Sequence, residues 1–147
     1  MPQFLRHTLR AGVLAVALAG CSDSTGPDPD DLAGSYDLIT IDGASLPVIV
    51  DQVGEDKAEI TMGTVTLDED GTFGDATEIR ITEGGVVTTE VQSTQGTWTV
   101  SGSTVTFLPN DGSSNYTMTW DGQLRLTQLF EGFTLVYEKE APLAARR

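Results

Sequence analysis

The chain has very little of the chemistry on which catalytic sites usually depend. Its 147 residues include one histidine, His7, and one cysteine, Cys21. No disulfide can form within the chain, and after His7 there is no Ser-His or Cys-His nucleophile pair and no imidazole ligand for zinc. Paired carboxylates could still act as acid and base, but the acidic residues stand mainly at expected turns, where backbone hydrogen bonds account for them. We therefore expect no enzyme, no catalytic residue and no cofactor.

Basic residues are also scarce. Eight Lys and Arg residues stand against 22 Asp and Glu residues, which gives a formal net charge of −14. Loss of residues 1–20 would remove Arg6 and Arg10, leaving 8 − 2 = 6 basic side chains against 22 acidic ones, a balance of −16. Such a surface repels phosphate backbones, so we expect no nucleic-acid partner. The acidic charge is typical of a strand-rich protein that avoids edge-to-edge pairing.

The first 21 residues have the pattern of an export signal. A basic start is followed by an apolar run over residues 11–19, too short to span a bilayer, and by Leu18-Ala19-Gly20-Cys21. This ending closely resembles the lipobox of bacterial lipoproteins. The resemblance implies cleavage before Cys21, a diacylglycerol on its thiol and an acyl chain such as palmitate on the new amino group. The alternative is an ordinary export signal with a chance cysteine.

The composition divides the chain into four parts. Residues 1–20 are the expected lipoprotein signal peptide, and residues 21–31 are the expected lipidated cysteine and a small, polar tether that extends roughly 35 Å at most. Residues 32–139 are the expected folded domain, and residues 140–147 a loose tail. We expect anchoring in the cell envelope through Cys21, and Ser22 after the cysteine favours the outer membrane in a Gram-negative bacterium.

Residues 96–108 give the clearest structural signal. A two-residue turn at Gly102-Ser103 would place the large apolar side chains on one face of a hairpin and the threonines on the other. The predicted pairs are Ser101 with Thr104, Val100 with Val105 and Trp98 with Phe107.

Other turns predict further hairpins by the same reasoning. We expect a bulge at Gly63, an edge strand or bulge at Pro47 and, at most, one helical turn within residues 51–58. The predicted pairs are Leu67 with Phe73, Ile81 with Val87, Ile79 with Thr89, Phe107 with Tyr116, Trp120 with Leu124, Met118 with Leu126, Phe130 with Phe133, and Leu126 with Tyr137.

These hairpins predict an all-β fold, an antiparallel up-and-down meander of about 8–10 strands closed into a barrel. Closure would bury the apolar face and remove both open edges together. Several segments resemble the lipocalin-like (calycin-type) domains of small bacterial lipoproteins, which implies a lipocalin-like barrel. These segments are residues 32–38, Asp42-Gly43, residues 70–73, residues 96–98 and residues 135–137.

The interior of the expected barrel raises the functional question. Its large side chains either fill the barrel or line a pocket for one apolar ligand, and their number favours a filled interior. Asp75 and Thr77 share the parity of Phe73; we expect a bulge at Gly74 to turn them outward, the alternative being a partly wet interior. The candidate core or ligand-lining residues are Tyr36, Phe73, Trp98, Phe107, Tyr116, Met118, Trp120, Leu126, Phe130 and Tyr137.

A metal site is not expected. Asp68, Glu69 and Asp70 are clustered carboxylates, but they stand in a tight hairpin turn, whereas calcium needs six or more oxygens from a longer loop. The function predicted from the sequence is a membrane-anchored, non-catalytic binding module for a small apolar ligand or an envelope protein. The alternative is a structural or interaction barrel with a filled core and no ligand.

Overall fold

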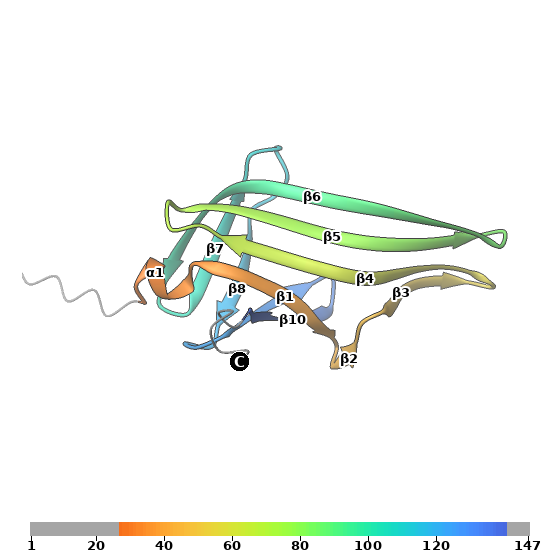
Figure 1. Cartoon of the computed structure of the whole chain (residues 1–147), viewed down its shortest axis with the longest axis horizontal. Coiled ribbons are helices and arrows are strands. Elements are labelled where there is room, and N and C mark those ends of the chain that lie inside the picture. Colours follow the sequence, from red (N-terminus) through yellow and green to blue (C-terminus); the bar gives the residue numbers. More distant parts are fainter. Residues whose placement is uncertain (1–26, 141–147) are drawn as a thin grey trace, which may run out of the picture.

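Ten antiparallel strands form one sheet, and eight of them close into a barrel (Figure 1). The computed structural model describes residues 27–140, so the expected signal peptide, Cys21 and residues 141–147 lie outside the described part. The strands follow the order β2-β1-β10-β9-β8-β7-β6-β5-β4-β3, and pairing of β1 with β4 closes the barrel. Their bounds are β1 Gly34–Ile41, β2 Ala44–Ser45, β3 Val48–Val53, β4 Asp56–Leu67, β5 Thr72–Glu83, β6 Val86–Ser101, β7 Thr104–Pro109, β8 Tyr116–Trp120, β9 Arg125–Phe130 and β10 Phe133–Lys139.

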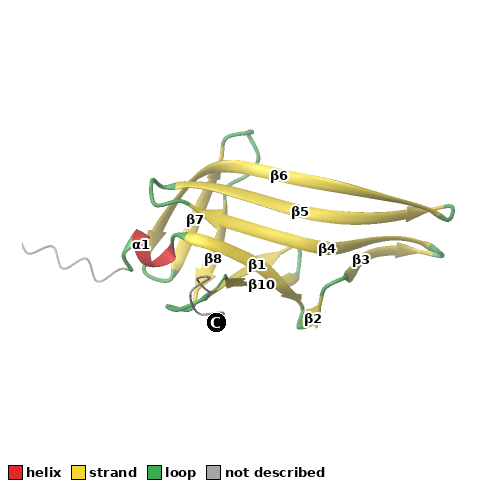
Figure 2. Cartoon of the chain, in the orientation of Figure 1, coloured by secondary structure: helices red, strands yellow, loops and turns green. Residues whose placement is uncertain are grey.

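The predicted fold class is confirmed, because each strand from β3 to β10 pairs with the next one in sequence and β1 joins β10 to β4 (Figure 2). The β6–β7 hairpin has the predicted register, with Trp98 opposite Phe107 and Val100 opposite Val105. Trp98 and Phe107 are buried while Thr97 and Thr99 are exposed. Alternation with period two therefore fixes which face enters the barrel. The predicted pairs Leu67–Phe73, Phe107–Tyr116, Phe130–Phe133 and Leu126–Tyr137 are also present.

The predicted register of the β5–β6 hairpin is wrong by one residue. Gly84 and Gly85 both have positive φ, 55° and 81°, and form a two-residue turn that pairs Glu83 with Val86. Two successive residues with left-handed backbone conformation form a type I′ turn, whose twist matches that of the two strands. This two-residue turn replaces the predicted three-residue loop. Ile81 consequently faces Thr88 and Ile79 faces Glu90.

The predicted register after Trp120 is wrong by two residues. Trp120 pairs with Leu126, not with Leu124, so the predicted pair of Met118 with Leu126 is wrong as well. Asp121 lengthens the loop, because its Oδ1 accepts hydrogen bonds from the backbone N–H groups of Gln123 (2.9 Å) and Arg125 (3.0 Å). A shift of two residues keeps side chains on the same face, so Leu126 still points into the core.

Two smaller predictions about β3 and β4 are corrected. The bulge lies between Ile60 and Met62 rather than at Gly63. Gly63 instead packs closely against Leu38, because a Cβ added to Gly63 would lie 3.0 Å from the Leu38 side chain. Residues 51–58 contain the end of β3, a turn and the start of β4, with no helical turn. Pro47 precedes β3, which is an edge strand as expected.

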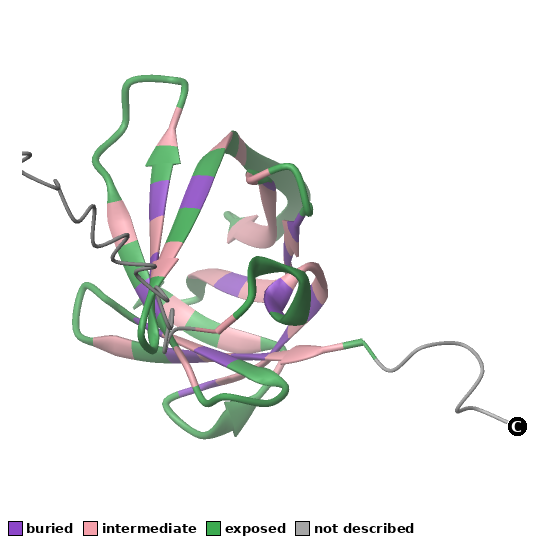
Figure 3. Cartoon of the chain, turned by 90° about the vertical axis from the view of Figure 1, so that its left-hand side faces the viewer, coloured by how far each residue is buried: buried purple, intermediate pink, exposed green. Residues whose placement is uncertain are grey.

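A short helix closes one end of the barrel. Helix α1 (Pro29–Leu32) lies across this end in Figure 3, and its Leu32 is fully buried. The buried Tyr36 hydroxyl donates a 2.7 Å hydrogen bond to the Leu32 carbonyl oxygen. Lys139 donates to the Asp31 carbonyl oxygen (2.8 Å) and lies 5.8 Å from the Tyr36 ring centroid. Part of the expected tether is therefore docked on the barrel. No helix within residues 27–140 is long and apolar enough to cross a membrane.

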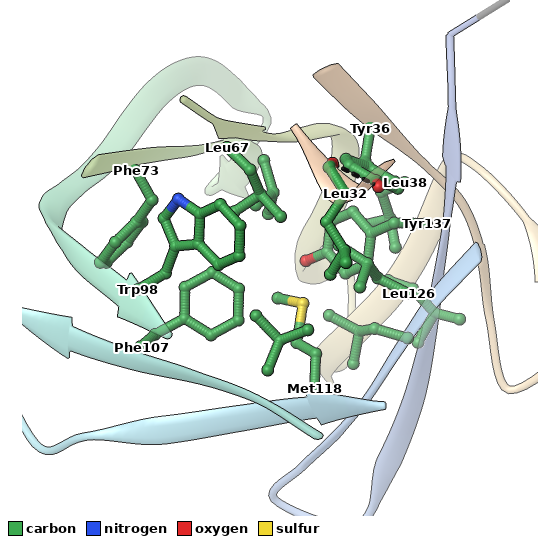
Figure 4. Packing of buried hydrophobic residues seen from close by; sticks show 14 residues of the cluster. Leu32, Tyr36, Leu38, Leu67, Phe73, Trp98, Phe107, Met118, Leu126 and Tyr137 are labelled. Atoms are coloured by element: carbon green, nitrogen blue, oxygen red, sulfur yellow. Dashed lines mark hydrogen bonds between the residues drawn. The ribbon is translucent and has the colours of Figure 1, made fainter. Parts of the chain in front are cut away.

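The closed half of the barrel is filled with side chains (Figure 4). Phe73 and Phe107 meet edge to face with centroids 5.0 Å apart, and Trp98 donates from Nε1 to the Asp68 carbonyl oxygen at 3.1 Å. The expectation of a filled interior is correct for this half only. The buried core consists of Leu32, Tyr36, Leu38, Ile41, Val65, Leu67, Phe73, Trp98, Val105, Phe107, Met118, Leu126, Leu135 and Tyr137.

Candidate functional site: a pocket at the open end of the barrel

The other half of the barrel contains a pocket with a volume of about 690 Å³. Most of its wall is apolar, and the apolar residues come from both sides of the barrel. Those from β1, β3, β4 and β5 are Leu38, Ile41, Val50, Ile60 and Ile79, and those from β9, β10 and their connecting turn are Phe130, Phe133, Leu135 and Tyr137.

The pocket exists because the strands differ in length. Strands β4 and β5 have 12 residues each and β6 has 16, whereas β7, β8 and β9 have five or six. The long strands project beyond the barrel, as Figure 1 shows, so their inner face has no complete opposite wall. Side chains from the short strands therefore cannot fill this end, while the half around Trp98 and Phe107 is packed.

Asp75 points into this pocket. Its Oδ2 accepts a 3.2 Å hydrogen bond from the hydroxyl of Tyr116, which projects from β8. The expected bulge at Gly74 is wrong, because Gly74 pairs with Gln95 and Asp75 with Thr94 in unbroken register. Thr77 also lines the pocket. The alternative of a partly wet interior is the correct one.

The environment of Asp75 alters three titratable groups. Burial raises the pKa of Asp75, and the Tyr116 hydrogen bond opposes this shift. Burial, together with the nearby Asp75 charge, raises the pKa of the Tyr116 and Tyr137 hydroxyls. Both tyrosines therefore stay protonated and can donate hydrogen bonds, while the carboxylate is held in a site that disfavours its charge.

No basic residue lines the pocket. Its charged lining residues are Asp75 and Glu131. The four basic residues of the described range interact elsewhere: Lys57 and Arg80 each lie 3.1 Å from Glu59, Arg125 lies 3.3 Å from Glu138, and Lys139 binds the Asp31 carbonyl oxygen. The pocket is therefore apolar over most of its wall, and its only charged lining groups within residues 27–140 are two carboxylates.

The ten predicted core or lining residues lie in both halves of the barrel, and Tyr137 belongs to the buried core as well as to the pocket wall. Tyr116, Phe130 and Tyr137 line the pocket, and Phe130 stands 52% exposed at its rim. The others belong to the core or pack against it: Tyr36, Phe73, Trp98, Phe107, Met118, Trp120 and Leu126. Sequence reasoning missed Asp75, Gln92, Thr94 and Gln128 as pocket residues. The parity that Asp75 shares with Phe73 was the signal that could have identified it.

The turn that carries Asp68, Glu69 and Asp70 uses its carboxylates locally. Asp70 Oδ1 accepts from the Thr72 N–H (2.9 Å) and from the Thr72 hydroxyl (2.6 Å), and these bonds lower the Asp70 pKa. Among residues 27–140 no group of three or more His, Cys, Asp or Glu side chains is arranged to hold a metal ion.

No family model, curated protein or solved structure matches the chain. The fold and the pocket together define a closed eight-stranded antiparallel barrel with one filled end and one hollow end. This architecture is consistent with a lipocalin-like fold.

Proposed function

We propose that the protein is a non-catalytic binding module that holds one small, largely apolar molecule in the pocket at the open end of the barrel. The observation that carries this proposal is the pocket of about 690 Å³ with a mainly apolar wall. Binding pockets for small molecules have volumes of roughly 300–1,000 Å³ and combine an apolar lining with a few polar groups. Asp75 and Tyr116 are such polar groups.

The lining favours binding over catalysis. Its ionisable residues are Asp75, Glu131, Tyr116 and Tyr137. The pKa of each tyrosine is raised, which makes these hydroxyls poor bases and nucleophiles at neutral pH. The arrangement offers an apolar surface for the ligand and hydrogen bonds that orient it, which a carrier or sensor of an apolar molecule needs.

We place the module at a membrane of the cell envelope, as an exported lipoprotein anchored through lipid on Cys21. Support comes from the Leu18–Cys21 lipobox pattern and from the absence of any second cysteine to pair with it. More than one acyl chain gives stable anchoring. An envelope protein that delivers or receives the ligand is the natural partner, and the outer membrane is favoured in a Gram-negative cell.

Blocking the pocket should abolish binding. We expect Thr77→Trp to lower the affinity for the neutral fluorescent probe N-phenyl-1-naphthylamine by about tenfold or more, because the indole would occupy the cavity. The matched control is Thr89→Trp, since Thr89 is exposed on the opposite face of the long strands. Fluorescence titration measures the affinity of the wild type and of both variants for the probe. Equal affinity in the wild type and Thr77→Trp would contradict the proposed site, as would no binding to the wild type. Native mass spectrometry of the purified protein would additionally reveal a co-purifying molecule.

Removal of the cysteine should release the protein from the membrane. We expect Cys21→Ser to eliminate incorporation of labelled palmitate and to move the protein from the membrane fraction to the soluble fraction. Ser22→Ala, next to the cysteine, is the control and should keep the label. Palmitate incorporation into Cys21→Ser would exclude Cys21 as the lipidated residue.

A further inference from the structure

We propose that the pocket selects cationic amphiphiles, with an ammonium group at the Asp75 carboxylate and an apolar chain along the wall. The inference rests on the proposed function and specifies its ligand class. It arises from Asp75, a partly buried carboxylate in the pocket that no positive side chain of the described range neutralises.

The first observation is the incomplete solvation of Asp75. Tyr116 is its one side-chain donor among residues 27–140, and the bond is made to Oδ2. Oδ1 therefore remains available to a group inside the pocket. A carboxylate removed from water without a counter-charge is unfavourable, and the raised pKa of Asp75 reflects that cost. An ammonium group bound here would supply both the charge and the missing hydrogen bond.

The second observation is the sign of the surrounding charge. Glu131 lines the same pocket, and Glu90 faces Ile79 on the adjacent inner face of β6. The described basic side chains are paired with other groups and do not line the pocket. A fatty acid would add a carboxylate to a pocket that Asp75 and Glu131 already line, with Glu90 nearby, which disfavours binding of anionic amphiphiles.

The third observation is the apolar wall around the carboxylate. Ile60 and Ile79 come from the long strands, while Phe133 and Leu135 come from β10 across the pocket. An alkyl chain between them would bury apolar surface at about 25 cal/mol per Å². The apolar wall provides affinity for the alkyl chain of any amphiphile, and Asp75 discriminates between the head groups.

The test compares three molecules with the same chain: dodecylamine, dodecanol and dodecanoate. The full chain carrying Cys21→Ser is titrated by calorimetry at neutral pH, below the aggregation concentration of each molecule. Dodecylamine is then protonated, because alkylamines titrate near the lysine side chain, at about 10.4. We expect dodecylamine to bind about tenfold tighter than dodecanol, and dodecanoate to bind weakest.

Variants separate the pocket carboxylate from the general negative charge. Asp75→Asn should reduce dodecylamine affinity about tenfold and leave dodecanol almost unchanged. Glu69→Gln removes the same charge from an exposed turn and should change neither affinity. Thr94→Lys places an ammonium directly across the strand pair from Asp75, where it would pair with the carboxylate, and should abolish the preference for dodecylamine over dodecanol.

The outcomes also distinguish this inference from the proposed function. Equal binding of all three molecules, or a dodecylamine affinity that Asp75→Asn does not change, would overturn the inference and leave the binding module standing. Tightest binding of dodecanoate by the wild type would overturn it too. Failure of all three molecules to bind would contradict the proposed function itself. If Asp75→Asn does not fold, Thr94→Lys provides the test. Loss of the dodecylamine preference in Thr94→Lys would support the inference, and an unchanged preference would overturn it.

Discussion

Replacing Gly96 by alanine should lower the free energy of unfolding by about 3 kcal/mol or more. Gly96 lies in β6 opposite Pro109, at the junction of the filled half and the pocket. A Cβ at this position would overlap the carbonyl oxygen of Leu108 and lie 2.8 Å from Phe73 Cε1. The Leu108 oxygen belongs to the backbone, so the β6–β7 pairing itself would have to shift. Urea denaturation followed by tryptophan fluorescence measures the change.

Gly74→Ala is the matched control for this prediction. Gly74 lies in β5 and pairs with Gln95 of β6, the residue before Gly96. A Cβ added to Gly74 would have no neighbouring atom within 4 Å. We expect this variant to be unchanged or stabilised by up to about 1 kcal/mol, since alanine reduces the entropy of the unfolded chain. A similar loss of stability in both variants would show that the tight approach of β6 and β7 is not the cause.

Truncation of Phe107 to alanine should be the second large effect, a loss of about 3–5 kcal/mol. Phe107 is fully buried, with its ring stacked on Tyr116 at a centroid distance of 4.7 Å and edge to face with Phe73. Its removal would leave a cavity between the filled core and the pocket, because the neighbouring rings cannot close over it. Chemical denaturation measures the loss.

The same substitution at Phe130 tests whether position or residue type decides the result. Phe130 is 52% exposed at the rim of the pocket. Phe130→Ala should therefore cost no more than about 1 kcal/mol, since half of its surface already contacts water. Equal losses at Phe107 and Phe130 would be inconsistent with a barrel that is packed at one end and open at the other.

Much of the fold follows from local sequence patterns. Alternation fixes the inward faces at Trp98 and Phe107, and most glycine-bearing turns fix the correct register. The errors arise where two turn geometries fit one sequence. Gly84 and Gly85 suit a two-residue turn as well as a three-residue loop, and the choice depends on the twist of both strands. At Asp121 the loop length depends on a side chain that binds two backbone N–H groups.

The site was less predictable than the fold. Parity places Asp75 inside, but the cost of burying a carboxylate argued for a bulge that the structure does not contain. The cost is reduced by Tyr116, which comes from a strand 41 residues away in sequence. The pocket itself results from unequal strand lengths around the barrel, a global property that no single segment encodes. Helix α1 was missed because four residues are too few to show helical periodicity.

The most direct test of a barrel that is hollow at one end is an NMR titration that identifies which backbone amide resonances shift when a molecule binds. Titration with dodecanol should shift the resonances of Thr77, Thr94 and Gln128 around the pocket, and leave those of Leu32 and Leu67 in the closed end unchanged. Shifts centred on the closed end, or none at saturating dodecanol, would contradict the account.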